Sequence, residues 1–268
     1  MIAMSESFEP LERELILEQL SGASRAWLKR FEIHEEIDST NSHLLRLGDA
    51  GIDGIVCLAE HQTRGKGRRG RTWLDQPGRG IALSLGRRVH RPLAEIAPIG
   101  LVVGVAVADA LRRMDVSSVS LKWPNDVLIG GAKAGGILVE VASATAPQIV
   151  VGVGLNVGGT AEIAAQLGRD IGAVRRGNAE LSRNTLAAAL IDAIVQRLSE
   201  FEADGFGPIR EQWAALDAYR DRTVRIHAPS GDTFGVARGV TGTGELRLET
   251  DAGVFVFNSG EVSLREQV

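Results

Sequence analysis

Residues 119–142 read VSLKWPNDVLIGGAKAGGILVEVA, two largely apolar runs separated by a pair of glycines. Gly130 and Gly131 can adopt the positive φ angles of a tight turn, so we predict two strands, 119–129 and 132–142, joined as a hairpin. A further apolar run, QIVVGVGLNV at 148–157, predicts another strand directly after them. The centre of the chain is therefore expected to form a β-sheet.

The flanking sequence predicts helices that back this sheet. Apolar residues recur at helical spacing in several stretches, while alternating or continuous apolar runs predict more strands. The expected helices are 11–20, a short one beginning within 38–41, 94–114 and 184–204, and the expected additional strands are 31–37, 55–60 and 81–89. Together these elements predict an α+β domain with a mixed sheet.

Beyond Asp221 the pattern changes to five short strands with turn residues between them: TVRIHA, GDTFGVARGV, ELRLET, GVFVFN and EVSLR. Short strands at this spacing are typical of a small barrel or sandwich. We therefore expect two domains, 1–220 and 221–268.

The composition is that of an ordinary globular protein: 268 residues, of which 44% are hydrophobic and 24% charged. A formal net charge of -4 argues against a dedicated nucleic-acid binder. The single cysteine, Cys57, can form no internal disulfide and has no metal-ligand companions nearby in the sequence, so we interpret it as a small buried hydrophobe. Neither a secretory leader nor a long apolar run is present, and we expect a cytoplasmic protein.

Residues 61–73, HQTRGKGRRGRTW, concentrate positive charge on a glycine-rich segment between two predicted strands. Its cations are Arg64, Lys66, Arg68, Arg69 and Arg71, and its glycines are Gly65, Gly67 and Gly70. One interpretation is a solvated surface loop. The other is an anion-binding loop whose glycines expose backbone N–H groups, with Trp73 placed to stack on a base.

Two further stretches combine charge with apolar surroundings. KWPND places Lys122, Asn125 and Asp126 inside an otherwise apolar run, where charged groups need partners. AKAGGILVE places Lys133 just before Gly135 and Gly136; a lysine in such a position is often only solvated. Taken together with the basic loop, these residues could surround one polyanionic ligand.

The segments GKGRRGRTW, KWPND, K-x-G-G-I-L-V-E and VGVGLNV resemble those of biotin protein ligases, also called biotin–[acetyl-CoA-carboxylase] ligases. The resemblance extends from about residue 31 to the C-terminus in the same order. It implies a catalytic domain of the biotin/lipoate ligase type followed by a small SH3-like barrel. It also implies an enzyme that uses ATP and Mg²⁺ to make biotinyl-5′-adenylate and then biotinylates a lysine of a biotin carboxyl carrier protein.

The resemblance assigns roles to particular residues. Lys133, Arg68 and Arg71 would be catalytic, contacting the biotin carboxylate and the α-phosphate. The biotin site would comprise Ser39, Thr40, Asn41, Gln62, Gly65, Lys66, Gly67, Arg68, Lys133 and Gly136, although Ser39 and Thr40 are equally suited to capping a helix. ATP would contact Arg68, Arg71, Trp73, Lys122, Asn125, Lys133 and Asn156. Asp126 would help to place magnesium, or would have only a structural hydrogen-bonding role.

Lys66 departs from the family pattern, which usually has arginine there and so a planar, bidentate cation. Only about thirty residues precede the first catalytic-domain strand, too few for the winged helix-turn-helix of the repressor-type members. We expect a ligase without operator binding, without nucleic-acid or membrane partners, and either monomeric or weakly dimeric. Three alternatives stay open: a biotin or nucleotide sensor without transfer activity, a nucleic-acid-binding module and a lipoate ligase.

Overall fold

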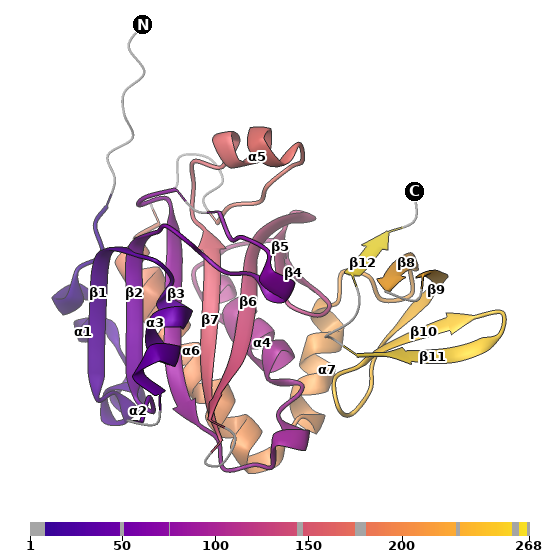
Figure 1. Cartoon of the computed structure of the whole chain (residues 1–268), viewed down its shortest axis with the longest axis horizontal. Coiled ribbons are helices and arrows are strands. Elements are labelled where there is room, and N and C mark those ends of the chain that lie inside the picture. Colours follow the sequence, from indigo (N-terminus) through magenta and orange to yellow (C-terminus); the bar gives the residue numbers. More distant parts are fainter. Residues whose placement is uncertain are drawn as a thin grey trace, which may run out of the picture.

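The computed structural model describes residues 9–48, 51–74, 76–143, 147–174, 181–228, 231–258 and 263–266. It contains a seven-stranded sheet with strand order β1-β2-β3-β7-β6-β5-β4 and a five-stranded sheet with order β11-β10-β9-β8-β12 (Figure 1). In the large sheet β1 and β2 pair in parallel and all other neighbours pair antiparallel. The predicted mixed sheet is thus confirmed.

The elements of the first part of the chain follow the predicted order with three added helices. The strands are β1 (Arg30–Ile37), β2 (Ile55–Gln62), β3 (Gly80–Arg88), β4 (Val119–Lys122), β5 (Asp126–Ile129), β6 (Ala132–Ser143) and β7 (Gln148–Asn156). The helices are α1 (Arg13–Gln19), α2 (Gly22–Trp27), α3 (Thr40–Leu47), α4 (Ile99–Arg113), α5 (Ala161–Leu167), α6 (Arg183–Asp204) and α7 (Gly207–Leu216). Of these, α2, α5 and α7 were not predicted.

Helices cover the two faces of the large sheet unequally. The apolar α4 packs against α6 and against β4, β5 and β6, while α1 and α2 also pack on α6, so these helices share one face. The opposite face carries α3, which contacts β2, β3 and β7 (Figure 1). Eleven of the fifteen residues of α4 are buried, which places the main hydrophobic core on its side of the sheet. The opposite face is therefore the one left open for a ligand.

The stretch 119–129 is not one strand, as predicted, but two. β4 and β5 pair with each other as a hairpin, with Lys122 opposite Asp126 and a cis Trp123–Pro124 peptide bond in the turn. Proline lacks the N–H needed in a strand ladder, and the Trp123 indole is buried with its Nε1 donating to the Gly244 carbonyl at 3.1 Å. The predicted turn at Gly130 and Gly131 is confirmed, with φ angles of 57° and 82°.

The five predicted C-terminal strands are confirmed as β8 (Thr223–Ala228), β9 (Gly231–Val240), β10 (Leu246–Thr250), β11 (Gly253–Phe257) and β12 (Ser263–Glu266). All neighbours pair antiparallel. Among the described residues the edge strands β11 and β12 do not pair with each other, so the sheet is not closed into a barrel by hydrogen bonds. Within the same residues no helix is long and apolar enough to span a lipid bilayer.

Candidate active site

A cavity of about 380 Å³ lies against the sheet beside α3 and the basic loop. Its wall includes nearly all the residues that the sequence singled out: Ser39, Thr40, Asn41, Gln62, Lys66, Gly67, Arg68, Arg71, Trp73, Lys122, Asn125, Asp126, Lys133, Gly136 and Asn156. Gly65, also predicted, is buried and does not line the cavity. There a Cβ would come within 2.6 Å of the Trp73 carbonyl oxygen, so only glycine fits.

The end of the cavity beside α3 is uncharged and polar. The parallel pairing of β1 and β2 brings their carboxyl ends to one edge, where Ser39 caps α3 and Gln62 ends β2. Ser39 Oγ accepts from the Ser42 N–H at 3.4 Å, so helix capping is one of its roles. Gln62 Oε1 accepts from the backbone N–H of Thr40 at 3.0 Å and lies 3.2 Å from its hydroxyl. This end presents both donors and acceptors in a buried setting.

Ser84 on β3 is part of this polar end, although the sequence analysis did not single it out. Its Oγ lies 2.7 Å from Thr40 Oγ1 and 2.5 Å from Asn41 Oδ1, and it is fully buried. Asn41 Nδ2 in turn donates to Glu140 Oε2 at 2.8 Å. Ser84 orients the pocket residues from behind. Its signal in the sequence is a lone hydroxyl within the apolar run IALSLG.

The basic loop is folded into a closed turn. The Gly67 N–H donates to the Arg71 carbonyl at 2.7 Å, and the Trp73 N–H donates to the Gly65 carbonyl at 2.9 Å. A single 3-10 turn, η2 (Arg68–Gly70), forms its tip. Gly70 has a φ of 71°, which glycine adopts without strain. The loop thus holds its cations at the rim of the cavity.

Arg68 is the innermost cation of the loop. Its Nη1 lies 3.2 Å from Asn125 Oδ1, and Asn125 Nδ2 donates to the Ile137 carbonyl at 2.8 Å. Burial lowers the pKa of the Arg68 guanidinium, and the negative charge of Asp126 opposes this shift. An arginine nevertheless stays protonated in proteins, so Arg68 is a fixed positive charge inside the cavity.

Lys133 also lines the cavity, and its Nζ lies 2.6 Å from Asp126 Oδ1. Both side chains are mostly buried, with exposures of 26% and 18%. Among the described residues that line the cavity, Asp126 is the only carboxylate. The lining cations are Lys66, Arg68, Arg69, Arg71, Lys122, Lys133 and Arg169, so the cavity is strongly electropositive.

The Trp73 ring lies across two facing glycines. Gly136 and Gly154 are register partners on β6 and β7, and a Cβ on Gly154 would lie 2.6 Å from the indole. The same group on Gly136 would lie 3.5 Å away, an ordinary contact. Lys133 Nζ is 5.9 Å from the ring centroid. The absence of side chains at these two glycines therefore lets the indole ring pack directly against the sheet backbone.

Two predicted nucleotide contacts have partners outside the cavity. Lys122 Nζ lies over the Tyr219 ring at 5.3 Å. The buried Asn156 donates through Nδ2 to the Gly172 carbonyl at 3.3 Å. Each still contributes to the cavity wall, and each is positioned from behind by a segment that follows β7 in the chain.

A magnesium ion could draw on only one carboxylate of the described wall, Asp126, whose Oδ1 is already engaged by Lys133. Magnesium usually keeps several waters and combines one or two carboxylates with substrate phosphates. Asp126 therefore fits as one ligand of an ion shared with a nucleotide, and does not by itself make an all-protein site.

Comparison with family models places two matches in the chain. Residues 35–156 match the Biotin/lipoate A/B protein ligase family, and residues 221–265 match the Biotin protein ligase C terminal domain. The first match contains the polar end of the cavity, the basic loop, Lys133 and Asn156. The second covers the five-stranded sheet.

Individual relatives match over nearly the whole chain. The bifunctional ligase/repressor BirA of Escherichia coli is 36% identical over 98% of this chain and 81% of its own length. The biotin–[acetyl-CoA-carboxylase] ligase of Mycobacterium tuberculosis is 34% identical over 94% of this chain and 95% of its own. Among solved structures, a biotin protein ligase from Aquifex aeolicus in complex with biotin and ATP has a TM-score of 0.78 at 27% identity, covering 90% of this chain and 100% of that one.

Proposed function

The chain belongs to the biotin protein ligase family, and from this premise we propose which of its residues carry out each step of the reaction. It is an ATP-dependent ligase. It activates biotin as biotinyl-5′-adenylate and transfers the biotinyl group to a lysine of the carrier domain of acetyl-CoA carboxylase. The observation that carries the residue assignment is the electropositive cavity in which Lys133 and Arg68 converge beside an uncharged polar end.

The first step brings two anions together. A carboxylate oxygen of biotin attacks the α-phosphorus of ATP, and the bond to the bridging oxygen of pyrophosphate breaks. Two unit charges about 4 Å apart repel by about 4 kcal/mol at an effective dielectric constant of about 20. Fixed cations at this point remove the repulsion and stabilise the charge that develops on the phosphorane oxygens.

Lys133 and Arg68 are the cations we assign to this point. Asp126 holds Lys133 Nζ at 2.6 Å, and Asn125 lies 3.2 Å from the Arg68 guanidinium, so both cations are oriented before substrate enters. Arg71 lies on the exposed rim and would contact the phosphates from outside. Trp73 would stack on adenine, with Asn156 and Lys122 as supporting contacts.

The polar end suits the ureido ring of biotin, which needs both donors and acceptors. Ser39, Thr40 and Gln62 supply them, and buried groups of this kind discriminate strongly against ligands that leave them unpaired. A lipoyl chain lacks the ureido group. The polar end therefore supports biotin over lipoate, the nearest rival substrate.

In the second step the lysine amine of the carrier attacks the acyl carbon of the adenylate. The acyl–phosphate bond breaks, AMP leaves with its electron pair, and the amine loses a proton. The electropositive cavity keeps stabilising the phosphate as it departs. In the first step Asp126 would hold magnesium, which would supply positive charge beside the departing pyrophosphate.

Several assignments of the chain as a whole are also part of the proposal. A boundary at residue 221 between a catalytic and a C-terminal domain is supported by the separate sheets and by the start of the second family match. A cytoplasmic location, a monomeric or weakly dimeric state and the absence of operator binding stay predictions. A DNA-binding assay at physiological salt tests the last of these.

Biotin-dependent exchange of labelled pyrophosphate into ATP tests the proposed chemistry. We expect exchange in the wild type with biotin, little with lipoate, and a loss of about a hundredfold or more in Lys133→Ala. Lys29→Ala, which removes a surface cation paired with Asp53, is the matched control and should keep wild-type exchange. A folded wild type that binds biotin with magnesium present but supports no exchange would instead be a sensor.

A further inference from the structure

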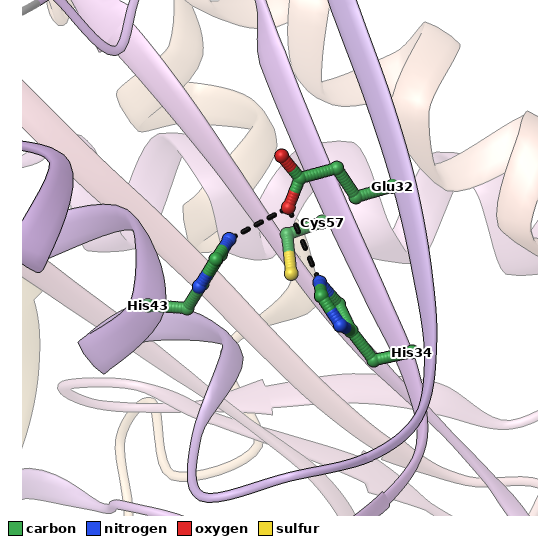
Figure 2. A group of neighbouring side chains, drawn as sticks. All are labelled: Glu32, His34, His43 and Cys57. Atoms are coloured by element: carbon green, nitrogen blue, oxygen red, sulfur yellow. Dashed lines mark hydrogen bonds and ion pairs between the residues drawn. The ribbon is translucent and has the colours of Figure 1, made fainter.

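Four side chains with metal-binding atoms meet between the sheet and α3, away from the cavity lining. Glu32 and His34 lie on β1, Cys57 is the register partner of Glu32 on β2, and His43 belongs to α3. Figure 2 shows the carboxylate, the two imidazoles and the sulfur pointing toward one another. One potential ligand atom from each residue lies within 4.8 Å of all the others.

The contacts within this cluster are close and specific. Glu32 Oε2 lies 2.6 Å from His43 Nε2 and 3.2 Å from His34 Nε2. The two rings meet edge to face, with centroids 5.0 Å apart. Cys57 is fully buried beneath them, while His34 is 32% exposed and gives access from solvent. A buried ligand below and an accessible one above make an entry path for an ion.

Cys57 has no metal-ligand companions nearby in the sequence, but the fold brings three of them to it. The companions come from another strand and from a helix, so they are distant in sequence and share no spacing motif. They adjoin Cys57 because β1 pairs in parallel with β2 and because α3 covers that face.

From this arrangement we infer that Glu32, His34, His43 and Cys57 form a structural site for Zn²⁺ or a similar divalent transition metal. Sulfur, imidazole nitrogen and carboxylate oxygen are the ligands of protein zinc, and four protein ligands with no open position are typical of structural sites. Metal–ligand distances of about 2.0–2.3 Å require ligand atoms roughly 3.3–3.7 Å apart. Small side-chain rotations bring the four atoms to that spacing.

The charges of the cluster also suit a divalent cation. A Cys57 thiolate and the Glu32 carboxylate neutralise the two charges of the ion, and the two imidazoles bind neutral. Arg30 pairs with Glu32 Oε1, which leaves Oε2 directed at the histidines and at the ion. Binding of the ion displaces the proton of the Cys57 thiol, whose pKa is raised by burial.

Occupancy would tie α3 to the sheet. His43 lies one turn after Ser39 and Thr40, the residues that begin α3 and line the polar end of the cavity. A metal bound here would fix that wall of the biotin pocket without contacting substrate. This consequence rests on the proposed function, whereas the metal site itself does not.

Cobalt substitution tests the site on the whole chain after treatment with a chelator. We expect one equivalent of Co²⁺ to bind with intense visible bands and a thiolate charge-transfer band, and Zn²⁺ to displace it. Because the chain has a single cysteine, that band reports on Cys57. His34→Gln and His43→Gln should each weaken binding at least about tenfold, and Cys57→Ser should abolish the charge-transfer band.

His90→Gln, which alters a 75% exposed histidine elsewhere, is the control and should bind as the wild type does. Absence of bound cobalt, or binding without a thiolate band, overturns the inference. The inference is also overturned if the wild type, His34→Gln and His43→Gln bind Co²⁺ with equal affinity. Since His34 and His43 are partly exposed, their variants should stay folded even where Cys57→Ser does not, and circular dichroism checks this. Pyrophosphate exchange measured on the same samples tests the proposed function separately, so failure of the metal site and failure of the proposed function can be told apart.

Discussion

At the scale of single residues, the proposed first step depends on the ion pair between Lys133 and Asp126. A lysine has a flexible stem and a compact charge, so it needs a partner to hold it in one place. Asp126 supplies that partner at 2.6 Å, and its placement on the neighbouring strand fixes the direction of the ammonium. The Asp126 carboxylate therefore orients the Lys133 ammonium without needing a bound metal ion.

Asp126→Asn separates the two roles considered for this carboxylate. If Asp126 mainly orients Lys133, the maximal rate of pyrophosphate exchange should fall about tenfold or more while the magnesium concentration for half-maximal rate stays unchanged. Asp109→Asn, which breaks a 2.6 Å ion pair with Arg197 away from the cavity, should leave both quantities unaltered. A raised magnesium requirement at an undiminished maximal rate would instead assign Asp126 to the metal.

At the scale of elements, local signals in the sequence were sufficient for some features and not for others. The turn at Gly130 and Gly131 could be predicted because positive φ is a property of glycine itself. The division of 119–129 into two strands was missed, although Pro124, which lacks the N–H of a strand ladder, is a local signal for it. The contact of the Trp123 indole with Gly244, in the turn between β9 and β10, could not be predicted. Likewise α7, anchored by the buried Trp213, depends on packing against α4.

In the candidate site, too, some residues could be predicted from local sequence and others depend on the fold. The basic loop and Lys133 could be singled out because each concentrates charge among glycines in a short stretch. Ser84 could not, because its role depends on α3 packing on β3, which places it next to Thr40. The cluster around Cys57 was missed for the same reason.

Gly154→Ala tests whether the position of the Trp73 ring against Gly154 matters for ATP binding. The added Cβ would lie 2.6 Å from the indole, so the ring must move and the proposed adenine stacking should weaken. We expect the KM for ATP to rise about tenfold, consistent with base–aromatic stacking of about 1–3 kcal/mol, with a smaller change in the KM for biotin.

Tryptophan fluorescence provides a second measurement, because displacement of Trp73 changes its surroundings. Gly100→Ala, in the first turn of α4, is the control. A Cβ there would lie 3.9 Å from its nearest neighbour, the Pro124 carbonyl oxygen. An unchanged KM for ATP in Gly154→Ala, with the protein folded, would show that nucleotide binding does not depend on the position of this ring.

At the scale of the whole molecule, the two sheets are joined by buried groups as well as by the chain. Trp123, between β4 and β5, donates to Gly244 in the turn between β9 and β10. The segment between α7 and β8 is held to the large sheet as well, because the Ala218 N–H donates to the Leu121 carbonyl at 2.9 Å. Asp217 lies at this junction, accepting from the Tyr219 N–H at 3.0 Å, while its buried Oδ2 has no hydrogen-bond partner among the described residues. Burial raises the pKa of Asp217 to about 6.

This shift makes stability depend on pH in a defined direction. The unfolded carboxyl titrates near 3.8, so between that pH and about 6 the native state binds a proton that the unfolded state does not. The free energy of unfolding therefore falls as pH rises through this window, and the loss persists above it. Asp217→Asn should abolish the fall and raise the free energy of unfolding at pH 7 by on the order of 1–3 kcal/mol.

Denaturant unfolding at about pH 4.5, just above the lower limit of the window, and at about pH 7, one unit above its upper limit, measures this difference. Asp170→Asn, at an exposed position, should leave the pH dependence of the wild type intact. Equal destabilisation of Asp217→Asn at both pH values would show that the effect does not depend on ionisation and would contradict the raised pKa. Greater destabilisation at pH 7 would show that the carboxylate is favourable in its charged form.

The order of strands in the large sheet has a consequence for biosynthesis. β7 lies between β3 and β6, so it joins the wall that holds the polar end to the wall that carries Lys133. A nascent polypeptide released before residue 148 lacks this strand and cannot unite the two halves. Premature termination products should therefore be unable to generate a reactive acyl-adenylate, which would otherwise modify nearby amines indiscriminately.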